Sequence, residues 1–154
     1  MLTKVLVAAA IAWPLVAGGA VWHRASHPDG GQRLWATAVY LAGSRICHQI
    51  PGRSFATRDV QWPVCARCSG LYLGAPFGVL ALVAWRRKFH AVTPATPHFR
   101  IVAFAAIPTV LTLVWEWGGM GTPSSLIRFT TALPLGAAIM RVLLQVTGTR
   151  ESIG

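Results

Sequence analysis

The chain has 154 residues, of which 54% are hydrophobic and only 12% are charged, and its net charge is +10. This composition excludes an ordinary soluble domain, because so few charges cannot cover a water-exposed surface, and it indicates a membrane protein. The basic residues lie at the ends of apolar stretches rather than along one stripe, so we expect no nucleic-acid binding and a lipid bilayer as the surrounding medium. The length predicts one membrane domain, residues 1–154.

The first predicted span is residues 4–22, in which an apolar stretch from Val5 to about Trp22 follows a single basic residue, Lys4. The stretch is long enough to cross a bilayer, which needs about 20 apolar residues. A cleaved signal peptide is the alternative, because the small residues Ala17 to Ala20 lie near the end of the stretch. Both interpretations place the following loop outside the cytoplasm.

Residues 34–46 are apolar but number only 13. A segment this short cannot cross the bilayer, so we expect a short helix that lies at the membrane interface. Residues 47–65 then form a polar loop that contains two of the three cysteines of the chain.

Three further spans are predicted at residues 66–85, 101–117 and 126–146. The loop between the first two, residues 86–100, contains four basic residues and no acidic one, which predicts a cytoplasmic position. The fold class is therefore all-α: an integral membrane bundle of about four transmembrane helices plus one short interfacial helix. We expect a multipass protein of the cell membrane, with a cytoplasmic N-terminus and the cysteine loop on the outer face.

Glycine recurs every four residues in the second span, at Gly70, Gly74 and Gly78. Residues four apart lie on one face of a helix, so the three glycines form a ridge without side chains. Small residues at such positions allow two helix backbones to approach closely, and we expect another helix to pack there.

The three cysteines of the chain are Cys47, Cys65 and Cys68. A C-x-x-C pair at the start of a helix directs two sulfurs to one centre, and a third thiol 18 positions upstream matches the spacing of structural zinc sites. We expect the three thiolates to bind a transition metal, with zinc as the first candidate. The fourth ligand is His48 in our prediction, and the alternatives are His27, Glu116 and water.

A disulfide or redox pair among these cysteines is the alternative. Cys65 and Cys68 flank Arg67 at a helix start, where free backbone N–H groups and a cation lower a thiol pKa. Haem attachment is excluded because Ser69, not histidine, follows the C-x-x-C pair.

Two charges lie near the outer ends of the last two predicted spans, Glu116 and Arg128. We expect them to pair, either as a structural tie between helices or as functional groups. Arg53 and Arg58 add two cations to the cysteine loop, where they would neutralise thiolates or bind an anionic substrate, or remain solvated.

Residues 47–55 (Cys-His-Gln-x-Pro-x-Arg-Ser-Phe) and residues 63–74 (Pro-Val-Cys-Ala-Arg-Cys-Ser-Gly-x-Tyr-x-Gly) resemble the signature of a family of small bacterial and archaeal membrane proteins of unknown function. That family also has an acidic residue and an Asn-x-x-Arg-x-x-Thr-Gly run in its last two spans. Glu116 is similar to the acid, and Arg128 and Thr131 to the arginine and threonine. Ser125 and Ala132 replace the asparagine and glycine. The resemblance implies no established activity, but it implies one site made of Cys47, His48, Arg53, Cys65, Cys68, Glu116 and Arg128.

The function that the sequence predicts first is a metal centre at one membrane interface, in an enzyme acting on a lipid-linked or small anionic substrate. In it Arg53 and Arg128 would hold the anionic group and Glu116 would act as the base. A thiol–disulfide redox protein is the second hypothesis. The third is a small transporter or partner subunit, which with four spans would require a homo-oligomer.

Overall fold

A computed structural model describes residues 1–27, 34–88 and 98–151 of the chain. Its five α-helices are α1 (Leu2–Ser26), α2 (Leu34–Ile46), α3 (Ala66–Lys88), α4 (His98–Trp117) and α5 (Ser125–Glu151). Four of them are long and apolar enough to cross a membrane, and α2 is not. The predicted all-α bundle of four spans and one short helix is therefore confirmed.

The helices extend beyond the predicted spans at most of their ends, most clearly in α5, which continues to Glu151. Hydropathy marks only the part of a helix that fits the bilayer core, whereas the backbone hydrogen bonds continue into the polar flanks. The predicted cytoplasmic loop, residues 86–100, falls largely on residues 89–97, which lie outside the described residues.

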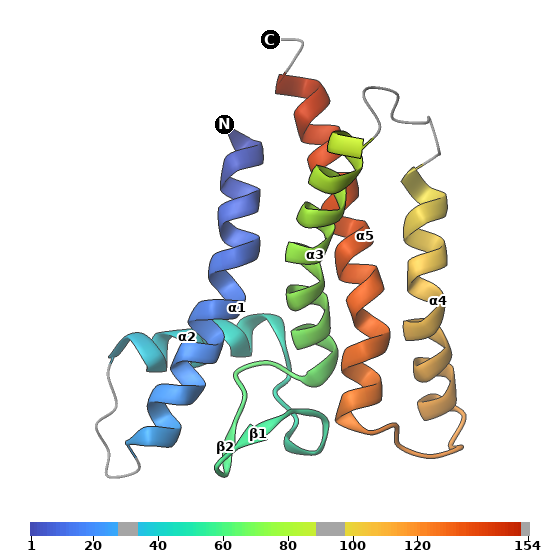
Figure 1. The fold of residues 1–154 in the computed structure, drawn as a ribbon. Helices are drawn as coiled ribbons and strands as arrows, with labels where there is room; N and C mark the ends of the chain where they lie inside the picture. Colours follow the sequence, from blue (N-terminus) through green and yellow to red (C-terminus); the bar gives the residue numbers. More distant parts are fainter. Residues whose placement is uncertain (28–33, 89–97, 152–154) are drawn as a thin grey trace.

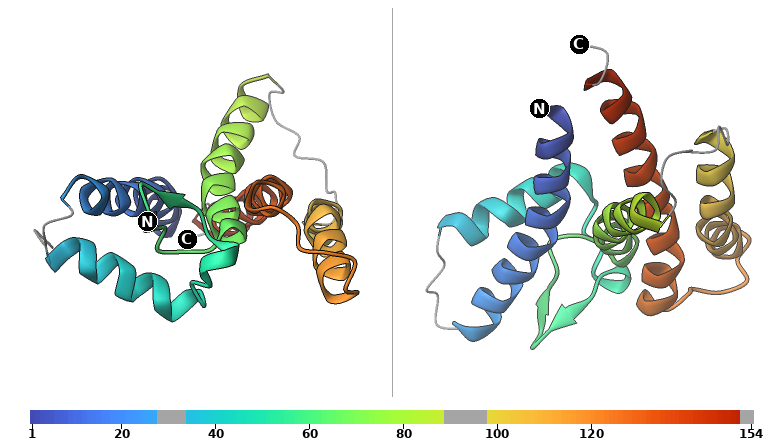
Figure 2. Two further views of the ribbon diagram at one scale, coloured as in Figure 1. Left: turned by 90° about the horizontal axis from the view of Figure 1, so that it is seen from below. Right: turned by 45° about the horizontal axis from the view of Figure 1, so that its top comes forward.

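The four long helices lie side by side in the order α1, α3, α5, α4, and α2 crosses α1 (Figure 1). Both termini lie at one end of the bundle, and the cysteine loop and the α4–α5 turn lie at the other (Figures 1 and 2). The cysteine loop, predicted for the outer face, thus shares one end of the bundle with the α4–α5 turn.

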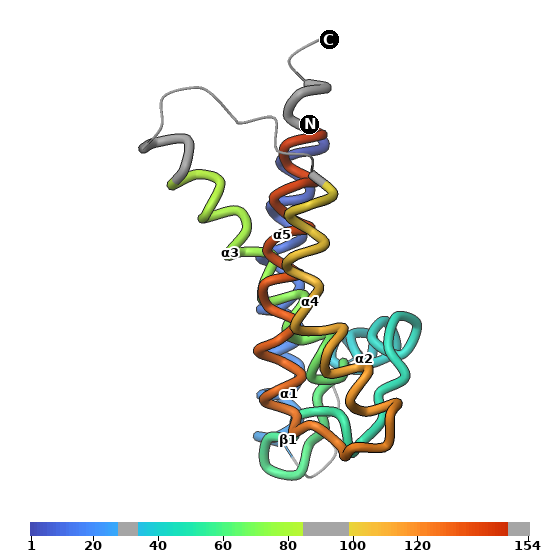
Figure 3. The backbone as a smooth tube through the Cα atoms, turned by 90° about the vertical axis from the view of Figure 1, so that its right-hand side faces the viewer, coloured from blue at the N-terminus to red at the C-terminus, as the bar shows by residue number. Residues whose placement is uncertain are grey.

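The glycine ridge of α3 packs against α5, as predicted. A side-chain carbon added at Gly70, Gly74 or Gly78 would collide with the backbone of α5, and one added at Gly136 of α5 would collide with Leu71. Glycine lets the two backbones touch, which is how small residues stabilise helix pairs in membranes. Toward its C-terminal end α3 then leans away from α5 (Figure 3).

Helix α4 lies at the outer edge of the bundle, and only 6% of the residues in its spanning segment are buried. Large apolar side chains such as Phe104 and Leu111 are exposed there. A chain that leaves so much apolar surface uncovered is suited to lipid rather than water. On its inner side, the hydroxyl of Thr109 donates a hydrogen bond to the Thr131 carbonyl of α5, at 2.8 Å.

The cysteine loop has secondary structure of its own, which was not predicted. A 3-10 turn, η1 (Pro51–Arg53), precedes an antiparallel hairpin of two short strands, β1 (Ala56–Thr57) and β2 (Val60–Gln61). The two residues between the strands, Arg58 and Asp59, have φ angles of 50° and 65°. Two successive positive φ angles are typical of the turn that joins hairpin strands most tightly.

Candidate metal centre and arginine cluster

The three cysteines meet where α2, the loop and α3 join. Cys47 follows the last residue of α2, Cys65 precedes the first residue of α3, and Cys68 lies in the first turn of α3. Their Sγ atoms all lie within 4.8 Å of one another, and all three thiols are free. Residues 18 positions apart in the sequence therefore form one cluster.

Gln49 fixes the loop that brings these cysteines together. Its side-chain amide donates hydrogen bonds to the carbonyls of Tyr40 in α2, at 3.0 Å, and of Pro63 before α3, at 2.7 Å. Its backbone adopts a φ of 48°, which turns the chain sharply after Cys47. The glutamine thus joins the two chain segments that bear Cys47 and Cys65.

The cluster has the chemistry of a thiolate metal site. Sulfurs bound at about 2.3 Å around a tetrahedral zinc ion lie about 3.8 Å apart, so a small contraction of the cluster would suffice. The backbone N–H of Cys65 already donates a hydrogen bond to Cys47 Sγ, at 3.1 Å. A hydrogen bond from Cys68 lowers the pKa of the Cys65 thiol to about 5, although burial opposes this shift. The protein thus stabilises negative charge on sulfur at this position.

The other predicted ligands do not enter the thiol cluster. His48 is exposed and lines the same cavity as the cysteines, but its ring nitrogens are not among the clustered ligand atoms. His27 is exposed, and its Nδ1 lies 3.0 Å from the carbonyl oxygen of His23. His48 as a metal ligand therefore stays a prediction.

A second cluster lies beside the thiols and is built around Glu116. One of its carboxylate oxygens pairs with Arg53, at 2.7 Å, and with Arg128, at 3.1 Å; the other pairs with Arg67, at 3.0 Å. The Glu116 and Arg128 side chains are 5% and 3% exposed, whereas Arg53 is 46% exposed. Three guanidinium groups around one carboxylate leave the cluster positively charged.

Two helix ends hold Glu116 and Arg128 in place. At the end of α4, Gly119 has a φ of 71°, and the N–H groups of Gly119 and Met120 bond to the carbonyls of Glu116 and Trp115. This left-handed glycine cap ends the helix directly after Glu116, at Trp117. At the start of α5, the Ser124 hydroxyl accepts a hydrogen bond from the Ile127 N–H, at 3.3 Å. Such an N-cap fixes the first turn, which bears Arg128.

The loop reaches this cluster through contacts with α5. Arg128 donates a hydrogen bond to the Gly52 carbonyl, at 3.4 Å, and the rings of Phe55 and Phe129 meet edge to face with centroids 5.6 Å apart. These contacts place Arg53 at Glu116. Arg58 does not join the site, since its guanidinium lies over the Trp22 ring instead.

One cavity of about 170 Å³ touches both clusters. Its polar walls are formed by Cys47, His48, Gln49, Arg53, Cys65, Arg67, Cys68 and Arg128. Both thiols and guanidinium groups therefore line this one cavity, as in a site for an anion next to a metal.

Arg67 is the site residue that the sequence did not predict as a partner of Glu116. Arg67 lies between Cys65 and Cys68, and from the sequence we considered it only as a cation that lowers a thiol pKa. The only available signal was a cation at the start of a predicted span, where uncompensated charge is costly.

Comparison with known proteins supports the family resemblance. Residues 47–142 match a family described as "Predicted membrane protein (DUF2085)". An uncharacterized protein of Methanothermobacter thermautotrophicus is 33% identical over 94 residues, which are 61% of this chain and 80% of the relative. One of Methanocaldococcus jannaschii is 28% identical over 108 residues, or 70% of this chain and 67% of the relative. No solved structure matches. Since the matched residues are well over half of its length, the chain belongs to this family of predicted membrane proteins.

Proposed function

We propose that this membrane protein binds zinc through Cys47, Cys65 and Cys68 and uses the adjacent arginine cluster to bind an anionic group of its substrate. The observation that supports this most directly is the cavity that thiols and guanidinium groups share. A zinc ion alone would need no arginines, and a salt-bridge cluster alone would need no thiols.

The number of clustered ligands favours a reactive centre over a structural one. Structural zinc sites are closed by four protein ligands, whereas catalytic sites have three and keep one position for water or substrate. Three thiols are clustered among the described residues. The shared cavity lies beside them, where a substrate group could approach the remaining position.

The arginines have the geometry for an anion. Guanidinium groups bind carboxylate or phosphate oxygens through paired N–H donors. Arg53 is half-exposed and lines the cavity, so it can contact an entering group, whereas Arg67 and Arg128 form the buried wall. The oxygens of Glu116 are directed at the three guanidinium groups, and we propose that this carboxylate positions them. Its predicted role as a base remains a hypothesis.

The chemistry that bound zinc would supply is polarisation of an oxygen of the substrate or of water. The chain would hold the anionic group on the arginines, next to the thiol cluster. We therefore propose a metal-dependent enzyme acting on an anionic substrate as the leading function.

Elemental analysis of the purified protein tests the metal centre. We expect about one zinc per chain in the wild type and in Ser44→Ala, a control at an exposed hydroxyl of α2, and less than a tenth of that in Cys65→Ser. Arg53→Gln should keep the metal and lose inorganic phosphate binding. Sub-stoichiometric metal in the wild type, combined with thiols whose alkylation follows the redox state of the cell, would instead support thiol–disulfide exchange.

A further inference from the structure

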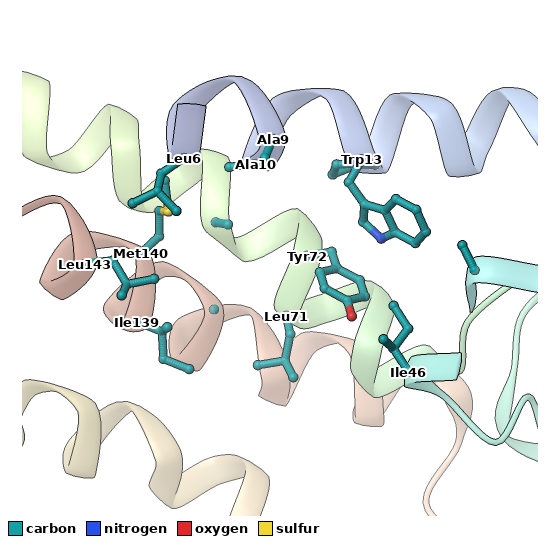
Figure 4. A pocket seen from close by; sticks show the side chains of 14 residues that line it. Leu6, Ala9, Ala10, Trp13, Ile46, Leu71, Tyr72, Ile139, Met140 and Leu143 are labelled. Carbon is teal, nitrogen blue, oxygen red and sulfur yellow. The ribbon is translucent and has the colours of Figure 1, made fainter. Parts of the chain in front are cut away.

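A second, larger cavity lies among α1, α2, α3 and α5, and its volume is about 580 Å³ (Figure 4). This is within the range of about 300–1,000 Å³ that is typical of small-molecule sites. Its walls are almost entirely apolar and include Leu6, Trp13, Ile46, Tyr72, Met140 and Leu143. Such walls suit a hydrocarbon chain and not a small charged molecule.

The apolar cavity leads toward the charged one. Ile46 lines both cavities and directly precedes Cys47. In Figure 4, Ile46, Tyr72 and Trp13 lie toward one end of the cavity, and Leu6, Met140 and Leu143 lie toward the other. A molecule that occupied both cavities would thus have its polar end at the cysteines and its apolar end among α1, α3 and α5.

We infer that the substrate is an anionic amphiphile, with its charged head in the cysteine and arginine cavity and a single hydrocarbon chain in the apolar cavity. The inference rests on the proposed function, which assigns the head site, and it selects a lipid-linked substrate over a small soluble anion. Bulk lipid would also cover apolar walls, but it has no reason to place its head at Arg53 and Arg128.

Two neighbouring alanines of α1 allow a matched test. Ala9 lines the apolar cavity, whereas Ala8 does not, and both side chains are exposed. Ala9→Phe would place a ring in the cavity, and Ala8→Phe would add the same ring outside it. Because both positions are exposed on one helix, both variants should fold alike.

The probe is hexadecyl phosphate, and its binding is measured on the full chain, metal-loaded, in phosphatidylcholine nanodiscs. Inorganic phosphate and uncharged hexadecanol serve as head-only and chain-only probes. We expect hexadecyl phosphate to bind the wild type at least tenfold more tightly than either. Ala9→Phe should weaken the binding of hexadecyl phosphate about tenfold and keep the affinity for inorganic phosphate within twofold of the wild type. Ala8→Phe should change neither affinity.

The outcomes separate the inference from the function on which it rests. If Ala9→Phe and Ala8→Phe bind hexadecyl phosphate as tightly as the wild type while inorganic phosphate still binds, the amphiphile is overturned and a small-anion site remains. Equal binding of hexadecanol and hexadecyl phosphate would show bulk lipid in the cavity and overturn it as well. If neither phosphate probe binds, or Arg53→Gln binds both as well as the wild type does, the anion site itself is wrong and the inference falls with it.

Discussion

Glu116 and Arg128 lie at helix ends of unfavourable polarity. A carboxylate in the last turn of α4 faces the negative end of the helix dipole, and a guanidinium in the first turn of α5 faces the positive end. Glu116 compensates the charge of Arg128, and Arg128 compensates that of Glu116 together with Arg53 and Arg67. Charges placed against both dipoles are poorly explained by helix stability alone, which favours a binding role for the cluster.

Glu116→Gln should therefore be costly, because it leaves three guanidinium groups without their shared counter-charge. We expect the free energy of unfolding to fall by about 3 kcal/mol. This is the lower end of the range for breaking a buried ion pair, because Arg53 opens the cluster to water. Reversible unfolding in mixed micelles measures this.

Arg53→Gln is the matched control for Glu116→Gln. It removes a half-exposed partner of Glu116, so we expect the free energy of unfolding to fall by less than about 1 kcal/mol. A Glu116→Gln, Arg128→Met double variant should regain much of the stability, since it removes both buried charges, but should not bind inorganic phosphate. If the double variant bound phosphate as the wild type does, the pair would be purely structural.

At the scale of single residues, the sequence predicted that the three cysteines cluster and that Glu116 pairs with Arg128, but it did not predict the whole site. Cysteine chemistry and intramembrane charge can be recognised without a fold. The contact of Arg67 with Glu116 joins residues 49 positions apart, and it depends on how α3, α4 and α5 pack, which no local pattern encodes. Whether the ring of His48 completes the thiol cluster likewise depends on the conformation of the loop after Cys47 and stays a prediction.

Among the elements, the α3–α5 pair determines the relative position of the two clusters. Helix α3 bears Arg67 and Cys68, and α5 bears Arg128. Their backbones touch at the glycine ridge. Any change in this contact should move thiols and guanidinium groups relative to one another.

Gly74→Ala tests this contact, because the added methyl would meet the Leu133 carbonyl of α5. We expect overpacking to lower the free energy of unfolding by about 2–3 kcal/mol and to abolish the binding of inorganic phosphate. Gly18→Ala is the control, since nothing lies within 4 Å of a side-chain carbon added there. The close contact would be disproved if both variants unfolded like the wild type.

Hydropathy and length were sufficient to predict the helices, including the bounds of α2, because membrane spans and short apolar segments differ mainly in these two properties. The hairpin was missed because its turn residues, Arg58 and Asp59, are not the Asn-Gly or Asp-Gly pair that announces such turns. A tertiary contact helps to fix it instead: the Tyr40 hydroxyl of α2 donates a hydrogen bond to the Gln61 carbonyl of β2, at 2.6 Å.

For the whole molecule, both termini lie at the end of the bundle away from the cysteines (Figure 1). The basic loop at residues 86–100 predicts that the termini are cytoplasmic and the cysteines are outside. The single domain over residues 1–154, the cell membrane as its location and a homo-oligomer remain predictions.

Labelling with a membrane-impermeant maleimide tests the orientation. In intact spheroplasts treated with a chelator, we expect the native cysteines to react. The cysteine of Ser26→Cys, at the same end of the bundle as the cysteine loop, should react as well. Leu2→Cys, at the opposite end, should react only after permeabilisation. The reverse pattern would show that the protein is inserted the other way round.

The two cavities use the chain differently. The three thiols and three arginines of the site lie within residues 47–142, the stretch that matches the family. The apolar cavity takes Leu71, Tyr72 and Met140 from the same stretch, but it takes Leu6, Ala9 and Trp13 from α1, which lies outside that stretch. For the proposed amphiphile, substitutions in α1 would therefore change which hydrocarbon chains bind and leave the thiols and arginines in place.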